Sequence, residues 1–580
     1  MLKIALAQME VRAGQPDINL EKMLKFIEDA KREESDMIVF PYMAVLSDIF
    51  DSTVINPSLS RDCESCNEDI LKASEGITVL FSNFVDNLFF AAKNGKWIDS
   101  SDSYELFKIR MKGKRYKIVY TFENAEYIAD LKFREKNPDF CVVFSSAPFV
   151  QCTTKGRDYH IGEHTKALGC PTIYVNCVGT QNKGKTIYPF DGNSTVYNSK
   201  GEIVLRGKSF EESLLLFDLG TVDSMPPIVE PEEPEIAEVY RALHGGLKHF
   251  LSQIGMKKMV IGISGGIDSA VDAALYTKVL GAENVLLVNM PSVYNSATTK
   301  GLSEQLAKNL GCNYMVVPIQ ESVDYTVRQL ESTPVTYLAD GSTHNIELSS
   351  FVRENIQARD RSSRVLAALA ASFGGGFTCN ANKAETTIGY ATMYGDCAGV
   401  VSALADLWKY QVYDLARYLN DTVYGREVIP QGIIDIVPSA ELSTAQNVDE
   451  GKGDPLKYPY HDYLFRAFVE NEDQVTPEEI LQWYADGKLE ENIGCEKGLV
   501  KKYFANAEEF IIISVDLANA ESLSECLSLF LAVRTCPNCS DVEFTALLNG
   551  VDCFRHNLAC SEHCNINHFV PSNNFALSAL

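Results

Sequence analysis

Short apolar runs recur along the first 220 residues, separated by stretches in which the apolar positions follow helical spacing. Each run has the length of a buried or half-buried strand, and residues 19–34 have the spacing of an amphipathic helix. Strands that alternate with helices in this way predict a large α/β domain. The predicted strands cover residues 4–9, 37–40, 77–81, 117–121, 141–145, 172–176, 194–197 and 214–218.

A proline-rich, acidic stretch then interrupts the pattern. Residues 223–236 contain four prolines and five acidic residues, and both features favour an extended linker. An amphipathic helical pattern begins near residue 236, and a second α/β pattern continues to residue 510. The last 70 residues are rich in Cys, Asn, Ser and His. We therefore expect a first domain over residues 1–222, a linker over 223–236, a second domain over 237–510 and a divergent tail over 511–580.

The charge of the chain narrows its range of partners. There are 52 Lys and Arg against 78 Asp and Glu, a net charge of −26, and such a surface repels the phosphates of nucleic acids. No apolar run reaches the roughly 18–20 residues that a membrane-spanning helix needs. The 16 cysteines are spread along the chain, which favours free thiols in a reducing compartment. We expect a cytoplasmic protein with no nucleic-acid or membrane partner.

One strand-to-helix turn is the strongest local signal. The apolar residues 259–263 lead into Ser264-Gly265-Gly266-Ile267-Asp268-Ser269 and then into a helical pattern. The glycines let the backbone approach an anion, and the amides at a helix N-terminus attract it. Asp268 suits the cation that accompanies pyrophosphate, and the lysine of the GxxxxGK[ST] loop is missing. The turn predicts a phosphate site of another kind, with a strand–helix turn that binds nothing as the alternative.

This turn resembles the signature of the ATP pyrophosphatases, and later segments narrow the resemblance to the NAD synthetases. They stand in the family's order over about 220 residues, with mild departures at Ala384, usually Ser, and Asn380, usually a Thr that contacts ATP. The resemblance implies a Rossmann-like ATP-pyrophosphatase domain that amidates deamido-NAD to NAD through an acyl-adenylate and releases AMP and pyrophosphate. The segments are residues 290–292, 354–359, 382–385, 389–390, 394–396, 409, 438–442 and 449–454.

The resemblance also implies roles in catalysis and metal binding. Asp268 and Glu385 are the candidate Mg²⁺ ligands, because this ion prefers hard oxygen donors. Asp268, Lys409 and Asp396 form the expected catalytic set. Lys409 would lie near the reacting phosphate and acyl centre, and Asp396 would lie on a loop that closes over the site. The alternative for Lys409 is a solvated lysine on a helix surface.

Substrate contacts follow from the same resemblance. Asn355, Arg359 and Glu385 are expected to hold deamido-NAD. His461, in a neighbouring segment, is expected to be structural and not catalytic. The residues expected to bind ATP are Ser264, Gly265, Gly266, Ile267, Asp268, Ser269 and Asn380.

The first domain resembles a nitrilase-type αββα domain, on residues 3–23, 36–45, 175–182 and 190–204. In glutamine-dependent NAD synthetases such a domain hydrolyses glutamine, which requires a Cys nucleophile, a Glu base and a Lys for the oxyanion. Here Tyr42 stands in the place of the Glu, and Phe122 in the place of the Cys. Three lysines of the right region stand outside the family's segment, namely Lys96, Lys108 and Lys112.

We therefore expect an amidase fold without glutaminase chemistry, and a synthetase that uses free or delivered ammonia. Cys141 fits a buried core position, whereas Cys152 and Cys177 stay open as other nucleophiles. Two alternatives remain: a glutamine-hydrolysing synthetase whose amidase site the alignment missed, and a nucleotide-binding scaffold without activity. The resemblance further suggests a homo-oligomer, either a dimer or an octamer.

The tail contains a group of cysteines and histidines whose spacing matches no strong metal-binding template. Thiolates and imidazoles at close spacing suit Zn²⁺, but we favour free cysteines over a structural zinc site. The residues are Cys536, Cys539, Cys553, His556, Cys560, His563, Cys564 and His568.

Overall fold

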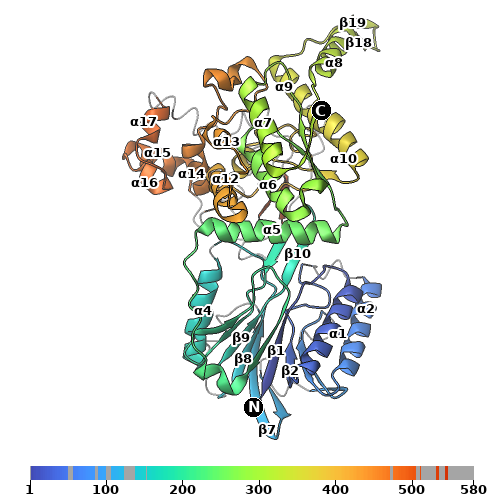
Figure 1. Ribbon diagram of the computed structural model, residues 1–580, viewed down its shortest axis with the longest axis vertical. Coiled ribbons are helices and arrows are strands. Elements are labelled where there is room, and N and C mark those ends of the chain that lie inside the picture. The colour runs from blue at the N-terminus through green and yellow to red at the C-terminus, as the bar shows by residue number, and fades with distance from the viewer. Residues whose placement is uncertain are drawn as a thin grey trace. The chain divides into compact units, whose positions relative to one another are not determined.

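The computed structural model describes residues 2–49, 56–84, 89–98, 106–122, 137–151, 153–470, 475–504, 510, 531–534 and 543–546. The chain divides into two compact units (Figure 1). The first comprises Met1–Lys257 with Lys278–Gly281, and the second comprises Lys258–Thr277 with Ala282–Leu580. Cys152 and the cysteines and histidines of the predicted zinc group lie outside the described residues.

The first unit contains two six-stranded sheets that pack face to face. One has the order β14-β1-β2-β3-β4-β5, and the other has the order β13-β12-β9-β8-β7-β6. The strands of the first sheet are β1 (Lys3–Gln8), β2 (Met37–Val39), β3 (Thr78–Phe81), β4 (Phe90–Lys93), β5 (Lys96–Trp97) and β14 (Ser213–Asp218). Those of the second are β6 (Leu106–Met111), β7 (Lys114–Phe122), β8 (Phe140–Phe144), β9 (Thr172–Val175), β12 (Thr195–Tyr197) and β13 (Ile203–Arg206).

Alternating side chains explain the four layers of this unit. Because successive residues of a strand point to opposite faces, Ile4 and Leu6 of β1 enter the core between the sheets, and Ala5 and Ala7 face helices. Helices α1 (Pro16–Arg32) and α2 (Pro57–Ala73) cover that outer face, and α4 (Thr153–Leu168) covers the outer face of the second sheet (Figure 1). The predicted αββα fold is confirmed.

The acidic linker leads into a long helix that belongs to the first unit. Residues 226–234 have no helix or strand, and α5 (Glu235–Gln253) follows them. This helix packs on the hairpin of β10 (Val178–Lys183) and β11 (Thr186–Asp191). The sequence places the start of the second domain at residue 237, whereas the compact units divide at residue 257. The reason is that the buried face of α5 packs on that hairpin.

The second unit is built on a parallel sheet with the strand order β17-β16-β15-β20. Apolar side chains on one face, including Val260 and Val288, pack against helices α8 and α10. The strands are β15 (Met259–Gly262), β16 (Val285–Asn289), β17 (Asn313–Val316) and β20 (Gly376–Phe377). The helices around them are α6 (Ile267–Leu280), α7 (Ala297–Leu310), α8 (Gln320–Ser332), α9 (Ser350–Arg359), α10 (Ala367–Phe373), α11 (Lys383–Ile388), α12 (Lys409–Tyr418) and α13 (Gln431–Asp435). The predicted α/β class is confirmed here too.

Four further helices of this unit share a core of their own, which contains Tyr460, Leu464 and Ile480. They are α14 (Tyr458–Val469), α15 (Pro477–Ala485), α16 (Leu489–Ile493) and α17 (Leu499–Tyr503). In the tail, the described residues form a short hairpin of β21 (Leu531–Arg534) and β22 (Glu543–Ala546). Among the described residues, no helix combines the length and the apolar character needed to cross a membrane.

Candidate active site

The predicted phosphate turn connects β15 to α6 and is held by its own hydroxyl groups. The Gly266 amide donates to Ser264 Oγ (3.1 Å), and Ser269 Oγ donates to the Gly266 carbonyl (3.1 Å). Gly265 has a φ of +93°, and a Cβ atom there would lie 2.4 Å from the Thr299 carbonyl oxygen. Only glycine fits both the left-handed backbone and the close approach of α7. The turn therefore has a specified shape in which Ile267 begins α6.

Three charged side chains meet beside this turn. Asp268 lies in the first turn of α6, Lys409 is the first residue of α12, and Glu385 lies on α11. Lys409 Nζ lies 2.5 Å from Asp268 Oδ2 and 3.6 Å from Glu385 Oε1. The Lys409 side chain is 3% exposed, so the alternative of a solvated surface lysine is wrong. The ammonium group lies within reach of both carboxylates that were predicted to bind Mg²⁺.

Asn382 joins the same two carboxylates from another side. It is the N-cap of α11, where its side-chain oxygen accepts from the Glu385 backbone amide and its backbone amide donates to Glu385 Oε2 (3.2 Å). Its Nδ2 group also donates to Asp268 Oδ1 (3.2 Å). Asn382 is fully buried, so these bonds are shielded from water. No role was predicted for Asn382 from the sequence, although the Asn-x-x-Glu spacing of a capping box was visible there.

Burial controls the electrostatics of this group. Desolvation pushes the pKa of Glu385 upward, and the positive charge of Lys409 opposes this shift and favours the carboxylate. Burial by itself would lower the pKa of Lys409, but the Asp268 and Glu385 carboxylates hold it above its usual value. Lys409 therefore keeps its positive charge, which suits a group that stabilises negative charge on phosphate oxygens.

A second layer of polar residues surrounds Glu385. The Tyr458 hydroxyl lies 3.2 Å from Glu385 Oε1 and 3.3 Å from Asp454 Oδ2. Asp454 Oδ1 accepts from the Ala440 amide (2.9 Å) and from the Tyr390 hydroxyl (3.2 Å). The carboxylates of Asp268, Glu385 and Asp454 thus all raise the pKa of one lysine, Lys409. Tyr390 and Asp454 fall in segments that the sequence had singled out, whereas nothing in the sequence pointed to Tyr458.

Of the three residues predicted to hold deamido-NAD, Glu385 lies in the group with Lys409, and the other two lie on α9. Asn355 and Arg359 are on α9, and Arg359 Nε donates to the Met393 carbonyl (3.1 Å) on the loop that carries Asp396. Asp396 Oδ1 accepts from the Thr392 amide, and burial raises its pKa. The structure thus brings Arg359 to the Asp396 loop. Asn355 Nδ2 donates to the Phe351 carbonyl of its own helix.

Asn380, predicted to contact ATP, follows β20, which pairs with β15, the strand that precedes the phosphate turn. Its Nδ2 group donates to the Gly262 carbonyl (2.9 Å), and its Oδ1 accepts from the Thr378 hydroxyl (2.6 Å). The amide therefore links β20 to β15 next to Ser264. This position is compatible with the predicted role, because the residue borders the turn.

His461 has the environment of a structural residue. Its Nδ1 atom accepts from the Lys457 amide (2.8 Å), its ring stacks on Phe465, and the residue is fully buried. Burial lowers the pKa of His461 to about 4. The imidazole of His461 is therefore uncharged at neutral pH.

This burial predicts an acid-sensitive contribution to stability. An unfolded histidine binds a proton near pH 6.5, so lowering the pH from 7.5 to 5.5 favours the unfolded chain by about 1.4 kcal/mol through His461 alone. In His461→Asn, where Asn can still accept the Lys457 amide bond, this contribution is absent. Urea unfolding at both pH values measures the difference. Equal losses in the wild type and the variant would contradict the assignment.

In the first unit, the two predicted amidase positions meet, but as aromatic rings. Tyr42 follows β2, Phe122 ends β7, and their ring centroids lie 5.0 Å apart. Phe122 also packs near Tyr120 and Phe144. The three lysines do not complete a triad: Lys96 and Lys108 are exposed, and Lys112 is exposed and pairs with Asp36. Cys141 is buried in the core, as predicted.

Cys177, the other described candidate nucleophile, is fully buried. Its Sγ atom lies 3.7 Å from Ser146 Oγ and accepts from Gln181 Nε2 at 3.8 Å. Ser146 and Gln181 are not general bases. Cys177 also lacks the solvent exposure that reactive thiols have.

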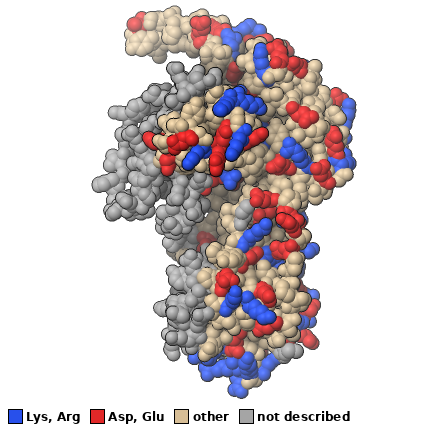
Figure 2. Space-filling model, turned by 90° about the vertical axis from the view of Figure 1, so that its left-hand side faces the viewer, with Lys and Arg blue, Asp and Glu red and all other residues tan. Residues whose placement is uncertain are grey.

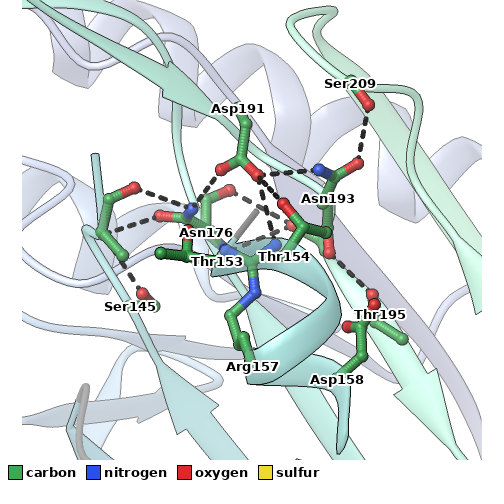
Figure 3. Close-up of polar contacts among 12 residues, drawn as sticks. Ser145, Thr153, Thr154, Arg157, Asp158, Asn176, Asp191, Asn193, Thr195 and Ser209 are labelled. Atoms are coloured by element: carbon green, nitrogen blue, oxygen red, sulfur yellow. Dashed lines mark hydrogen bonds and ion pairs between the residues drawn. The ribbon is translucent and has the colours of Figure 1, made fainter. Parts of the chain in front are cut away.

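The buried polar network of this unit converges on Asp191 (Figure 3). Its carboxylate accepts from Asn176 Nδ2 (3.2 Å), from Asn193 Nδ2 (2.7 Å) and from an Arg157 guanidinium nitrogen (3.2 Å). Thr154 adds a fourth donor. Because the charge of Asp191 is paired and its oxygens are saturated with donors, the network joins α4 to the ends of β9 and β11 as a structural element.

Known proteins are similar to this chain in sequence and in fold. A family model described as NAD synthase matches residues 239–493. A glutamine-dependent NAD(+) synthetase of Xanthomonas campestris is 28% identical over 504 residues, which cover 81% of this chain and 88% of the relative. One from Thermotoga maritima is 28% identical over 541 residues, covering 83% and 90% of the two chains.

Two solved structures have the same fold. A glutamine-dependent NAD+ synthetase of Acinetobacter baumannii, in complex with ADP, has a TM-score of 0.66 at 24% identity and covers 95% of this chain and 99% of its own. A glutamine-dependent NAD(+) synthetase of Cytophaga hutchinsonii has a TM-score of 0.61 at 16% identity, with 83% and 90% covered.

Proposed function

The chain belongs to the glutamine-dependent NAD(+) synthetase family, and from this premise we propose that it is a ligase that forms a C–N bond. Its substrates would be deamido-NAD, ATP and ammonia, and its products would be NAD, AMP and pyrophosphate. The single observation that carries the proposal is the group of Asp268, Glu385 and Lys409 beside the phosphate turn.

The chemistry requires a poor leaving group to be replaced by a good one. ATP transfers AMP to the carboxylate of deamido-NAD, so that the carboxylate oxygen leaves with AMP when ammonia attacks. The turn at residues 264–269 would hold the phosphates with backbone amides and hydroxyl groups. The buried ammonium of Lys409 would stabilise the charge that develops on phosphate oxygens, and the Asp396 loop would exclude water.

The residues at this site also fit Mg²⁺. Asp268 and Glu385 present carboxylate oxygens that already share one cation, the Lys409 ammonium. Among the described residues, no three His, Cys, Asp or Glu side chains form a metal cage. Mg²⁺ is commonly held by one or two carboxylates together with substrate phosphates, so two ligands suffice. When bound, the ion would neutralise charge on the departing pyrophosphate.

We propose ammonia as the direct nitrogen donor. The support is that Tyr42 and Phe122 occupy the two converging amidase positions with packed rings. A tyrosine with a pKa near 10 is a poor base at neutral pH, and phenylalanine has no nucleophile. The glutamine-dependent names of the relatives favour the second candidate, a chain that hydrolyses glutamine itself.

A comparison of nitrogen donors tests both proposals. With ATP, Mg²⁺ and deamido-NAD, we expect NAD formation with ammonium and little with glutamine at equal concentration, measured as NAD by an enzymatic end-point assay. Turnover with glutamine equal to that with ammonium would overturn the silent amidase domain. Stoichiometric thiol labelling by a reactive glutamine analogue would favour the second candidate. No ATP consumption with either donor would overturn the synthetase itself.

We further propose that the chain forms homo-oligomers. An arm of the second unit, formed by the end of α8 and the hairpin β18 (Val335–Tyr337) and β19 (Ser342–His344), exposes Tyr337 (61%) and Leu338 (91%). Two-stranded hairpins are marginally stable alone, and exposed apolar patches favour association. The arm lies at the top of Figures 1 and 2, and its visible face has few charged side chains. Sedimentation equilibrium of the purified chain tests this.

A further inference from the structure

We infer that Tyr458 is a positioning residue of the synthetase site, which fixes Glu385 through its hydroxyl group and Lys409 through its ring. The inference rests on the proposed function and adds a residue to it. Tyr458 lies at the first position of α14, 73 residues from Glu385 and outside every segment that carried the family resemblance. It is 5% exposed.

The hydroxyl group contacts two acidic side chains at once. It lies 3.2 Å from Glu385 Oε1 and 3.3 Å from Asp454 Oδ2. Glu385 Oε2 already accepts a hydrogen bond from the backbone amide of Asn382. With one oxygen held by Asn382 and the other by Tyr458, the carboxylate has a single orientation and keeps Oε1 toward Lys409. A hydrogen bond to a charged group of this kind is worth more than an ordinary one.

The ring has a separate effect. Lys409 Nζ lies 4.7 Å from the centroid of the Tyr458 ring, within the range of a cation–π contact. Asp268 holds the same ammonium from another direction. The ring therefore restricts the side chain of Lys409 without removing any of its hydrogen-bond donors. A phosphate oxygen that approaches the site would find the ammonium already oriented.

Tyr458 is itself held in place. It packs in a cluster with Trp408, Phe465 and Leu456, all of which are buried. Asp454, its second hydroxyl partner, is fixed by the Ala440 amide and by Tyr390, whose hydroxyl accepts from Gln446 Nε2 (2.8 Å). The rotamer of Tyr458 is therefore set by packing and by polar contacts, as a positioning role requires.

Two substitutions separate the hydroxyl from the ring. Tyr458→Phe keeps the ring and loses the hydroxyl, so we expect the Mg²⁺ concentration for half-maximal activity to rise roughly tenfold, with kcat within about twofold of the wild type. Tyr458→Leu loses both, so we expect kcat to fall roughly tenfold as well. Tyr463→Phe is the matched control, because Tyr463 lies on the same helix but stacks on Tyr410.

A binding measurement without turnover completes the test. Calorimetric titration of Mg²⁺ into each variant with α,β-methylene-ATP, whose scissile bond is blocked, should show the same roughly tenfold loss of affinity in Tyr458→Phe and none in Tyr463→Phe. Equal Mg²⁺ affinity in wild type and Tyr458→Phe would overturn the inference, and so would equal losses in both Phe variants. If the wild type formed no NAD, the proposed function would fail, and the titration would still decide the role of Tyr458.

Discussion

Replacing Asp268 with Asn is expected to lower kcat for ammonium-dependent NAD formation by roughly 100- to 1000-fold. The amide has the size of the carboxylate but lacks its charge, and this charge pairs with Lys409 and is one of the two expected to meet Mg²⁺. Steady-state rates at saturating ATP and deamido-NAD measure the effect. Raising the Mg²⁺ concentration should not restore the rate, because kcat and not only metal affinity is affected.

Asp414→Asn serves as the control for this variant. Asp414 lies on α12 with Lys409, but its side chain is 55% exposed and pairs with Arg417 at the surface. A surface pair of this kind contributes little, so the rate should stay within about twofold of the wild type. Wild-type activity in Asp268→Asn would show that the charge of Asp268 is not needed for the ATP chemistry.

Lys409→Met is expected to lower both stability and activity. Met retains the length of the side chain, but the carboxylates of Asp268 and Glu385 are then left in a buried site without their shared cation. Removing one partner of a buried pair costs about 3 kcal/mol or more of unfolding free energy. Urea unfolding followed by tryptophan fluorescence measures this loss, and kcat should also fall by roughly 100-fold or more.

Magnesium makes this second prediction more specific. If Asp268 and Glu385 bind the ion, Mg²⁺ should raise the unfolding midpoint of Lys409→Met more than that of the wild type, because the ion replaces the missing ammonium. Lys452→Met is the control, since Lys452 is half exposed and pairs with Glu450. A Lys409→Met protein as stable as the wild type would contradict the buried pair described here.

Local patterns in the sequence were sufficient for much of the fold. The short apolar runs at residues 4–9 and 141–145 predicted strands because runs of this length are typical of strands that are buried in a sheet. The hairpin β10–β11 was missed because Gly179, Thr180 and Gln181 interrupt its apolar pattern. The sequence placed helix α5 in the second domain, and only the structure shows that this helix packs on the hairpin.

The phosphate turn could also be found from the sequence. Two adjacent glycines after a buried strand and before a helix are a local signal, and the close approach of Thr299 explains the need for Gly265. The family segments then pointed to Asp268, Glu385 and Lys409. What the sequence could not supply was their contact, since Lys409 is 141 residues from Asp268.

The sequence by itself determined most strands and helices, and it was sufficient to predict the phosphate turn and aromatic residues at two expected amidase positions, because each of these depends on residue types and short spacings. Only the tertiary structure decided that the rings of Tyr42 and Phe122 pack together, that Asn382 links Asp268 to Glu385, and that Tyr458 contacts Glu385. The physical reason is that these contacts join segments far apart in the chain, and such contacts depend on how whole helices and sheets pack.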